Sequence, residues 1–562
     1  MKLFIVESPA KARTIKSYLG RDFVVIATMG HIRDLPRKEM GIDFVRLEPR
    51  YVFLPGKRKI VKRIVELAKK SEEVILASDK DREGEIISLH VKEIVSKYVG
   101  KTKRIEFTEV TKEGILNALQ SPRDIDHNLV NAQKTRRMLD RVVGYVISPI
   151  LFRHFRGMFK GKSFSAGRVQ SPALRLVCER ELEIRNFTPL AYYDVMLESE
   201  RDGKTFFLKL VSERLGDKEV KFGPDNRINE EKLSEIKDNV NLSDVRVVFS
   251  KKFRDSIKPL PPFKTSTLQQ EASAKLGFTP SKTMKIAQEL YEGIEIDGEF
   301  VGLITYIRTD SVRISEYALK RVREFIRERL GEEYLPPLPR VYEGRDDEQG
   351  AHECIRPTDV YRVPVSLKGK IPDGHFRLYE LIWKRFLASQ MKDAVVETAE
   401  VLVSDGRYSF YGVSKIVVDR QFLNFYPHSI PEEVFLPSLK EGEKLVPARL
   451  VYGRKVTQPP PRYTEATLIK KLEDEGIGRP STYATIVSTL IARKYVEKKG
   501  KSLVPTELGF AVYEFLKKNY PSVVDLGLTS YMESMLDKVE SGEVKDWKRI
   551  FVELLNKAKI SI

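Results

Sequence analysis

The first part of the chain alternates short apolar runs with amphipathic segments. Four runs are short and continuous, as in buried strands, and cover residues 3–6, 23–27, 74–77 and 105–107. Three segments carry apolar side chains at helical spacing, at residues 10–19, 60–70 and 83–98. Strands that alternate with helices are typical of a parallel sheet covered by helices. The pattern therefore predicts a Rossmann-like α/β domain over residues 1–145.

The pattern changes several times after this domain. Residues 128–183 are mostly helical, with a basic glycine-rich loop at 157–167. Two stretches, 189–256 and 394–450, alternate polar and apolar positions as strands do, and proline clusters at 259–262 and 459–461 mark breaks. Helical patterns fill the remainder, including a helix at 376–391. We expect a multidomain protein in which α/β, α and β parts follow one another, with the two β stretches paired in one domain.

Composition narrows the function. The 562 residues include 98 Lys and Arg against 80 Asp and Glu, a net charge of +18. Such an excess favours a polyanionic partner, and nucleic acid is the first candidate. No apolar run approaches the roughly 18 residues of a membrane span, so we expect no membrane protein. The first apolar run ends at Glu7, too short for a signal-peptide core, which predicts a cytoplasmic location.

An acidic turn, DKDREGE at 79–85, follows the third predicted strand and opens a helix. Ligands of open α/β sheets bind at the carboxyl ends of strands. Asp79, Asp81 and Glu83 could converge there on one hard cation such as Mg²⁺, and Glu7 ends the first strand beside them. A calcium loop is rejected because its twelfth position falls on His90. A solvated charge cluster that caps the helix remains the alternative.

The basic loop GMFKGKS at 157–163 resembles a phosphate loop but has three residues between its glycines where the motif needs four. No strand precedes it. We interpret it as a flexible basic loop, and ATP use is not supported.

Three further features could take part in phosphate chemistry. Tyr306 could be a covalent nucleophile, and Arg308, on the same face of an extended segment, could hold a phosphodiester. A packing role for Tyr306, one of 23 tyrosines, and a structural role for His352 stay open from spacing alone. A basic helical region could clamp a nucleic acid backbone, with Tyr145 to stack a base, or could be a solvated helix face; its arginines are Arg136, Arg137, Arg141, Arg168 and Arg175.

Taken together, these segments resemble the type IA DNA topoisomerases, and within them the bacterial topoisomerase I group, across essentially the whole chain. The matching motifs are FIVESPAKA at 4–12, GHIRDLP at 30–36, the 79–85 turn, RRMLDRVVGY at 136–145, SAGRVQS at 165–171, GLITYIRTDS at 302–311, AHECIRP at 351–357 and GIGRPSTYA at 476–484. The histidine in GHIRDLP is more similar to topoisomerase I than to topoisomerase III, the nearest competitor.

The resemblance implies a role for each site residue. Tyr306 would attack a phosphodiester of single-stranded DNA, leaving a 5′-phosphotyrosine link and a free 3′-hydroxyl. Arg308 and His352 would hold that phosphate, while Glu7 and Lys11 would assist the 3′-oxygen. Mg²⁺ would bind in a Toprim domain, and its ligands would be Glu7, Asp79, Asp81 and Glu83. The single-strand groove would include Arg136, Arg137, Asp140, Arg141, Tyr145, Gly167, Arg168, Gln170, Arg479, Ser481 and Thr482.

The resemblance also implies a four-domain toroid. Its parts would be a Toprim domain at 1–145, a helical base at 146–187 and 457–562, a β-rich arch at 188–262 and 386–456, and a tyrosine-bearing domain at 263–385. The covalent bond would conserve the phosphodiester energy, so resealing would need no ATP. Only Cys178 and Cys354 are present, which predicts no zinc ribbon and no zinc. We expect a monomer that relaxes negatively supercoiled DNA.

Two other classes of protein share some of these features. A Toprim nuclease or primase would use the acidic turn and Glu7 without a covalent tyrosine, and the Tyr306 segment favours the topoisomerase. A DNA-binding architectural protein would explain the charge but would not need converging carboxylates.

Overall fold

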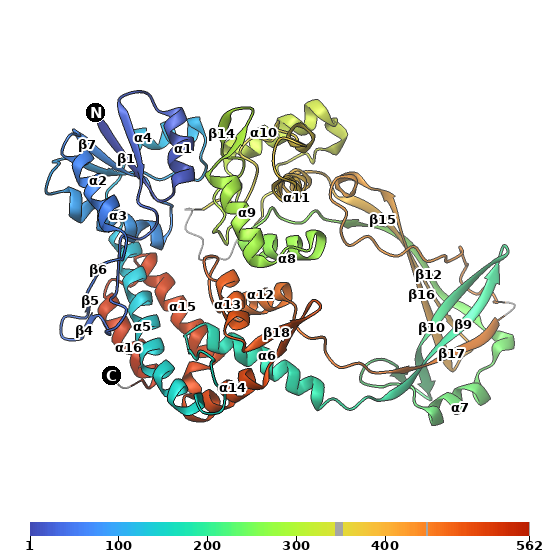
Figure 1. Cartoon of the computed structure of the whole chain (residues 1–562). Coiled ribbons are helices and arrows are strands. Elements are labelled where there is room, and N and C mark those ends of the chain that lie inside the picture. The colour runs from blue at the N-terminus through green and yellow to red at the C-terminus, as the bar shows by residue number, and fades with distance from the viewer. Residues whose placement is uncertain (343–351, 446–447, 561–562) are drawn as a thin grey trace.

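The computed structural model describes residues 1–342, 352–445 and 448–560. Figure 1 shows four regions that follow one another around a ring: an α/β region, a region of helices α8–α11, a long β-sheet and a second helical region that carries the C-terminal part of the chain. This arrangement agrees with the predicted toroid. Residue 351 of the AHECIRP motif lies outside the described residues.

The N-terminal region is a parallel four-stranded sheet of order β2-β1-β7-β8. Its strands are β1 (Lys2–Val6), β2 (Phe23–Ala27), β7 (Glu73–Leu76) and β8 (Thr102–Arg104). Its helices are α1 (Pro9–Tyr18), α2 (Arg58–Ala68), α3 (Arg82–Val95) and α4 (Lys112–Gln120). Two small hairpins pair β3 (Arg33–Asp34) with β6 (Val52–Phe53) and β4 (Ile42–Asp43) with β5 (Glu48–Pro49). The predicted parallel sheet is confirmed.

The fourth predicted strand, at 105–107, is wrong by three residues. The strand that pairs with β7 is Thr102–Arg104, which is polar. Ile105 and Phe107 are buried after it, because they pack into the core between the sheet and the neighbouring domain. The apolar run at 105–107 is thus a buried loop segment, which the pattern assigned to a strand.

The two separated β stretches form one antiparallel sheet, as predicted, and its strands do not follow one another in chain order. Its main order is β12-β15-β16-β10-β9-β17, with β11 on β10. The strands are β9 (Ala191–Arg201), β10 (Lys204–Leu215), β11 (Lys218–Lys221), β12 (Arg246–Ile257), β15 (Ala394–Ser404), β16 (Tyr408–Asp419) and β17 (Ala448–Val456). Helix α7 (Glu230–Asn239) contributes Leu233 and Ile236 to its core.

Two helical regions complete the ring. The tyrosine-bearing one contains α8 (Thr265–Leu276), α9 (Pro280–Glu292), the hairpin β13 (Ile294–Ile296) and β14 (Glu299–Val301), α10 (Glu316–Arg329) and α11 (Asp373–Ser389). The base contains α5 (His127–Phe155), α6 (Gln170–Arg185), α12 (Glu465–Asp474), α13 (Tyr483–Ala492), β18 (Val496–Lys499), β19 (Ser502–Pro505), α14 (Glu507–Asn519), α15 (Leu526–Glu540) and α16 (Trp547–Ala558).

The predicted domain boundaries at 145 and 385 lie inside continuous helices, α5 and α11. Helix α11 packs through Leu378, Ile382 and Phe386 into the core of the tyrosine-bearing region. Its last residues therefore pack with that region and not with the β-rich arch. That core also contains Phe4 and Ile75 of the parallel sheet. The α/β and tyrosine-bearing regions therefore share one hydrophobic core. No helix of the described part is both long and apolar enough to cross a membrane.

One buried group in α3 makes stability depend on pH. His90 is 2% exposed, lies edge-on to Tyr51 with ring centroids 4.4 Å apart, and has no hydrogen-bond partner on either nitrogen among the described residues. Burial, with nearby Arg33, lowers the pKa of His90 to about 3. The folded state therefore keeps His90 neutral where the unfolded chain takes up a proton.

We expect this histidine to cost stability as pH falls below 6.5, the ordinary value. The slope is about 1.4 kcal/mol per pH unit, so pH 5 should lose roughly 2 kcal/mol relative to pH 7.5. His90→Phe should be near neutral at pH 7.5, since no hydrogen bond is lost, and should remove this slope. Denaturant unfolding at pH 5 and pH 7.5 measures the change in unfolding free energy. An unchanged pH slope in His90→Phe would contradict the assignment of this slope to His90.

Candidate active site

The acidic turn lies where β7 ends and α3 begins, as predicted. Asp81 is the N-cap of α3 and accepts a hydrogen bond from the Gly84 backbone N–H at 2.8 Å. A Cβ on Gly84 would lie 2.1 Å from the Asp79 carbonyl oxygen, so only glycine allows the turn to close this tightly. The turn thus holds the carboxylates of Asp79 and Asp81 at the carboxyl edge of the sheet.

Glu7 and Lys11 both contact Asp79. The Asp79 backbone N–H donates to Glu7 Oε1 at 2.8 Å, and Lys11 Nζ lies 2.5 Å from Asp79 Oδ1. Burial and the charges of Asp79 and Asp81 raise the pKa of Glu7 to about 8. Burial lowers the pKa of Lys11, but the charge of Asp79 and its hydrogen bond to Lys11 act against burial, and the pKa lies above its ordinary value. At neutral pH the site therefore contains a protonated Glu7 beside a charged Lys11.

Tyr306 faces the same turn from the neighbouring region. Its hydroxyl donates to Asp81 Oδ2 at 2.5 Å, and Arg308 Nη1 lies 3.2 Å from the same oxygen. Burial, followed by the charges of Asp81 and Asp79, raises the pKa of Tyr306 well above its ordinary value. Tyr306 is 3% exposed and is a neutral phenol in this state. The predicted common placement of Tyr306 and Arg308 is therefore seen at one carboxylate.

Backbone contacts fix this segment against the sheet. The Tyr306 N–H donates to the Thr108 carbonyl at 2.7 Å, and the Thr305 hydroxyl donates to the Cys354 carbonyl at 2.8 Å. A Cβ on Gly302 would meet the Val110 carbonyl oxygen at 2.6 Å. Close approach of the two regions thus requires glycine at this position.

His352 stacks on Tyr306, with ring centroids 6.1 Å apart and 27° between planes. Burial and the charge of Lys80 lower the pKa of His352. The imidazole is therefore neutral at pH 7 and can donate one hydrogen bond, but it adds no positive charge. The structure brings Glu7, Lys11, Tyr306, Arg308 and His352 together around the turn.

The three carboxylates of the turn are not brought together. Glu83 Oε2 lies 2.9 Å from His31 Nε2, Asp79 is held by Lys11, and Asp81 by Tyr306. No group of three or more His, Cys, Asp or Glu within the described ranges is arranged to hold a metal ion. The predicted set of Asp79, Asp81 and Glu83 is not formed here because each has a protein partner.

The residues of the predicted groove lie on α5 and the loops around it, and most have partners. Arg137 pairs with Asp34 (Nη2 to Oδ2, 2.6 Å), Arg141 Nη1 donates to the Pro36 carbonyl at 2.9 Å, and the Tyr145 hydroxyl donates to the Lys38 carbonyl at 2.9 Å. These contacts join α5 to the segment that carries GHIRDLP. Tyr145 remains 39% exposed, as stacking on a base would require.

A second part of the predicted groove corresponds to residues where α6 and α13 begin. Gly167 and Gln170 bracket Arg168, and the Gln170 amide donates to Ser165 Oγ at 3.2 Å. Thr482 accepts a hydrogen bond from the Arg479 N–H at 2.9 Å, which orders the turn that exposes Ser481.

An acidic face of α15 was missed by the sequence analysis. Glu533, Asp537 and Glu540 follow helical spacing and bind arginines from three segments. Arg168 Nη1 lies 2.7 Å from Glu533 and Nε 3.0 Å from Asp140, Arg82 binds Asp537 and Glu540, and Arg479 binds Asp537. Arg168 is 3% exposed, so this predicted groove residue lies under the surface. Arg136 lies 4.0 Å from Asp140.

The i, i+4, i+7 spacing of these acids was a readable signal, but nothing in the local sequence indicated which arginines they meet. Arg82 is the notable partner, since it belongs to the acidic turn. The contact of Arg82 with α15 joins the α/β region to the base beside Tyr306.

The comparisons with known proteins agree with this geometry. A family model for DNA topoisomerase matches residues 124–550, and a Toprim domain model matches residues 2–110. The DNA topoisomerase 1 of Fervidobacterium islandicum is 43% identical over 560 residues, which cover 99% of this chain and 77% of that protein. The solved structure of full-length topoisomerase I from Thermotoga maritima is similar with a TM-score of 0.85 and 40% identity, covering 99% of this chain and 90% of that one. The chain belongs to the bacterial type IA DNA topoisomerases.

Proposed function

We propose that the protein changes DNA topology by cutting one strand through Tyr306 and resealing it. The observation that carries the proposal is the hydrogen bond from the Tyr306 hydroxyl to Asp81 of the Toprim turn, with Arg308 on the same carboxylate. A Toprim nuclease would not need a tyrosine at this place. A phenol held among an arginine, a lysine and carboxylates suits nucleophilic attack on a phosphodiester.

In the proposed cleavage step the Tyr306 oxygen bonds to phosphorus, the bond from phosphorus to the 3′-oxygen breaks, and the phenolic proton passes to a carboxylate of the turn. Glu7, protonated because its pKa is about 8, gives its proton to the departing 3′-oxygen. Lys11 and Arg308 stabilise negative charge on the reacting phosphate. Resealing runs in reverse and needs no ATP, since the phosphotyrosine bond retains the phosphodiester energy.

We also propose that Asp79, Asp81 and Glu7 hold Mg²⁺. The donor set fits, because carboxylate oxygens are the ligands this ion takes. Burial and the charges of Asp79 and Asp81 raise the pKa of Glu7, so Glu7 would join them as a ligand in its ionised form, after it has given up its proton. Glu83 could join only after its bond to His31 is released. When bound, Mg²⁺ would orient phosphate oxygens and supply positive charge.

The groove on α5, with Arg136, Arg137, Asp140, Arg141 and Tyr145, is proposed to hold the single strand. A second set completes it: Gly167, Arg168, Gln170, Arg479, Ser481 and Thr482. Because several of its arginines pair with carboxylates, binding of phosphates would exchange one partner for another. We propose that the enzyme works as a monomer in the cytoplasm, without zinc.

Relaxation of a plasmid tests the function. The protein should relax negative supercoils with Mg²⁺ and without ATP, in linking-number steps of one, and leave positive supercoils largely untouched at moderate temperature. Negative supercoiling lowers the cost of unpairing, about 1.4 kcal/mol per base-pair step, and positive supercoiling raises it. High salt should slow the reaction because arginine and lysine contacts to phosphates are screened. Equal rates on both supercoil signs would contradict entry through a single strand.

A further inference from the structure

The basic loop at 157–163 lies beside the hairpin β18–β19 in the base and takes no part in the site above. Together they line a pocket of about 380 Å³. Three of its lining residues are lysines: Lys162 from the loop, Lys494 from the turn after α13, and Lys498 from β18. The loop and the hairpin come from segments more than 300 residues apart, so the fold gathers these cations in one place.

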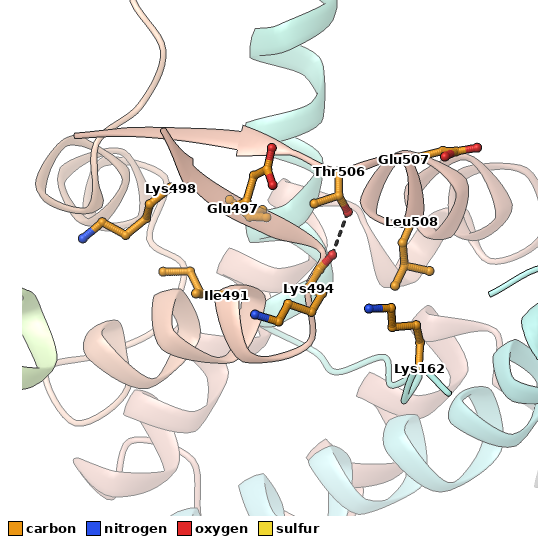
Figure 2. A pocket seen from close by; sticks show the side chains of 9 residues that line it. Lys162, Ile491, Lys494, Glu497, Lys498, Thr506, Glu507 and Leu508 are labelled. Atoms are coloured by element: carbon orange, nitrogen blue, oxygen red, sulfur yellow. Dashed lines mark hydrogen bonds between the residues drawn. The ribbon is translucent and has the colours of Figure 1, made fainter. Parts of the chain in front are cut away.

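The lining of the pocket carries three lysines and two glutamates. In Figure 2 the side chains of Lys162 and Lys494 lie below the hairpin, that of Lys498 extends to the left, and the Glu497 carboxylate lies on the hairpin between Lys498 and Lys494, with Glu507 at the upper right. Within the described residues, no ion pair is found for Lys162 or Lys494, and Lys498 binds Glu465 at 2.8 Å. Lys162 and Lys494 are therefore the cations of this pocket that can attract an anionic partner.

Lys494 is held firmly in its unusual place. Its φ is +60°, a left-handed conformation that side chains other than glycine and asparagine rarely adopt. The Thr506 hydroxyl donates to the Lys494 carbonyl at 2.6 Å, which fixes the turn at the start of α14.

The pocket is joined to the proposed single-strand groove. Tyr495, next to Lys494, accepts a hydrogen bond from the Ser165 N–H at 2.8 Å and donates to the Ser165 carbonyl at 2.9 Å. Ser165 in turn contacts Gln170 of the groove. Arg493 also donates to Ser163 Oγ at 2.8 Å. The loop therefore adjoins the segment 165–170 of the proposed groove, and buried Tyr495 ties that segment to the turn that carries Lys494.

We propose that Lys162, Lys494 and Lys498 bind the phosphate backbone of the duplex DNA that flanks the single strand. None of the residues that line the pocket is aromatic, so it offers charge for phosphates and no ring for unpaired bases. The proposed groove, in contrast, has the ring of Tyr145 on which an unpaired base could stack. The inference rests on the proposed function, since it assumes a strand in the groove, and it assigns the loop a role in admitting the junction between duplex and single strand.

The test compares a duplex that carries a single-stranded tail with the tail alone. The variant is Lys162→Gln with Lys494→Asn, because asparagine tolerates the left-handed turn. The matched control is Lys59→Gln with Lys62→Gln, which replaces two exposed lysines of α2 and removes the same amount of positive charge. We expect the variant to weaken binding of the tailed duplex roughly three- to ten-fold and reduce the salt slope by about 2, one unit per lost phosphate contact.

Binding of the tail alone should change little, so the affinity ratio of the two substrates should fall only in the pocket variant. Equal weakening on both substrates would overturn the assignment to duplex, and so would an equal effect of the α2 control or no effect at all. Thermal unfolding checks the fold, and Lys498→Gln provides an independent variant. Cleavage of the tail by the unaltered protein tests the proposed function separately, so the two failures are distinguishable.

Discussion

Tyr306→Phe should lose all detectable DNA cleavage and relaxation while it still binds single-stranded DNA. Only the phenolic oxygen can form the ester, and no other group in the site replaces it. The fold should survive, because the change removes one hydroxyl whose hydrogen bond to Asp81 contributes about 1 to 3 kcal/mol. Gel shifts measure binding, and denaturing gels with labelled DNA measure the covalent adduct.

Tyr291 offers a stringent control. Its ring lies 5.3 Å from that of Tyr306, and its hydroxyl donates to Asp79 Oδ1 at 3.3 Å. Tyr291→Phe therefore also removes a buried hydroxyl from the acidic turn. We expect this variant to keep forming the adduct, at a reduced rate. An adduct in Tyr306→Phe would remove Tyr306 from the mechanism.

Asp79→Ala combined with Asp81→Ala should reduce Mg²⁺-dependent relaxation at least about 100-fold, since the carboxylates proposed to orient the cation are gone. Single-strand binding should persist, because we assign it to the proposed basic groove, and loss of two negative charges does not oppose it. Relaxation measured across a Mg²⁺ titration, with gel shifts in parallel, separates the two effects. Normal relaxation by the double variant at limiting Mg²⁺ would show that the acidic turn only caps helix α3 and does not bind the metal.

The double variant needs two controls. Lys11 is fully buried against Asp79, so loss of that partner leaves an uncompensated charge that can cost about 3 to 5 kcal/mol. Asp81→Asn alone keeps the Lys11 pair and should still impair relaxation. Asp217→Ala with Asp225→Ala, exposed on the arch, changes net charge equally and should leave relaxation unaltered.

The pattern of the sequence predicted most of what is local. The parallel sheet, the turn at the end of β7 and the union of the two β stretches follow from periodicity and from strand-end geometry. The Toprim domain is confirmed by its family match. The shift of the last strand to Thr102–Arg104 could not be predicted, because the sequence does not distinguish an apolar run buried in a loop from one in a strand.

The rest depends on contacts between distant segments. Glu83 turns to His31, and Arg168 is buried against Glu533 of α15, more than 360 residues away. Spacing within a segment indicates which side chains share a face, but not which charge from another domain will meet them. For this reason the acidic residues and tyrosine of the site were predictable, while the partners that hold them in this state were not.

The most direct test of the central claim is the end of the DNA that stays on the protein. Single-stranded DNA labelled at either its 5′ or its 3′ end is incubated with the protein, denatured and separated, and the tryptic peptide that carries the nucleotide is sequenced. A 5′-phosphotyrosine link predicts that the 3′ label migrates with the protein, that the 5′-labelled fragment is free with a 3′-hydroxyl, and that the modified residue is Tyr306. Retention of the 5′ label, modification of another residue, or no adduct would contradict the account.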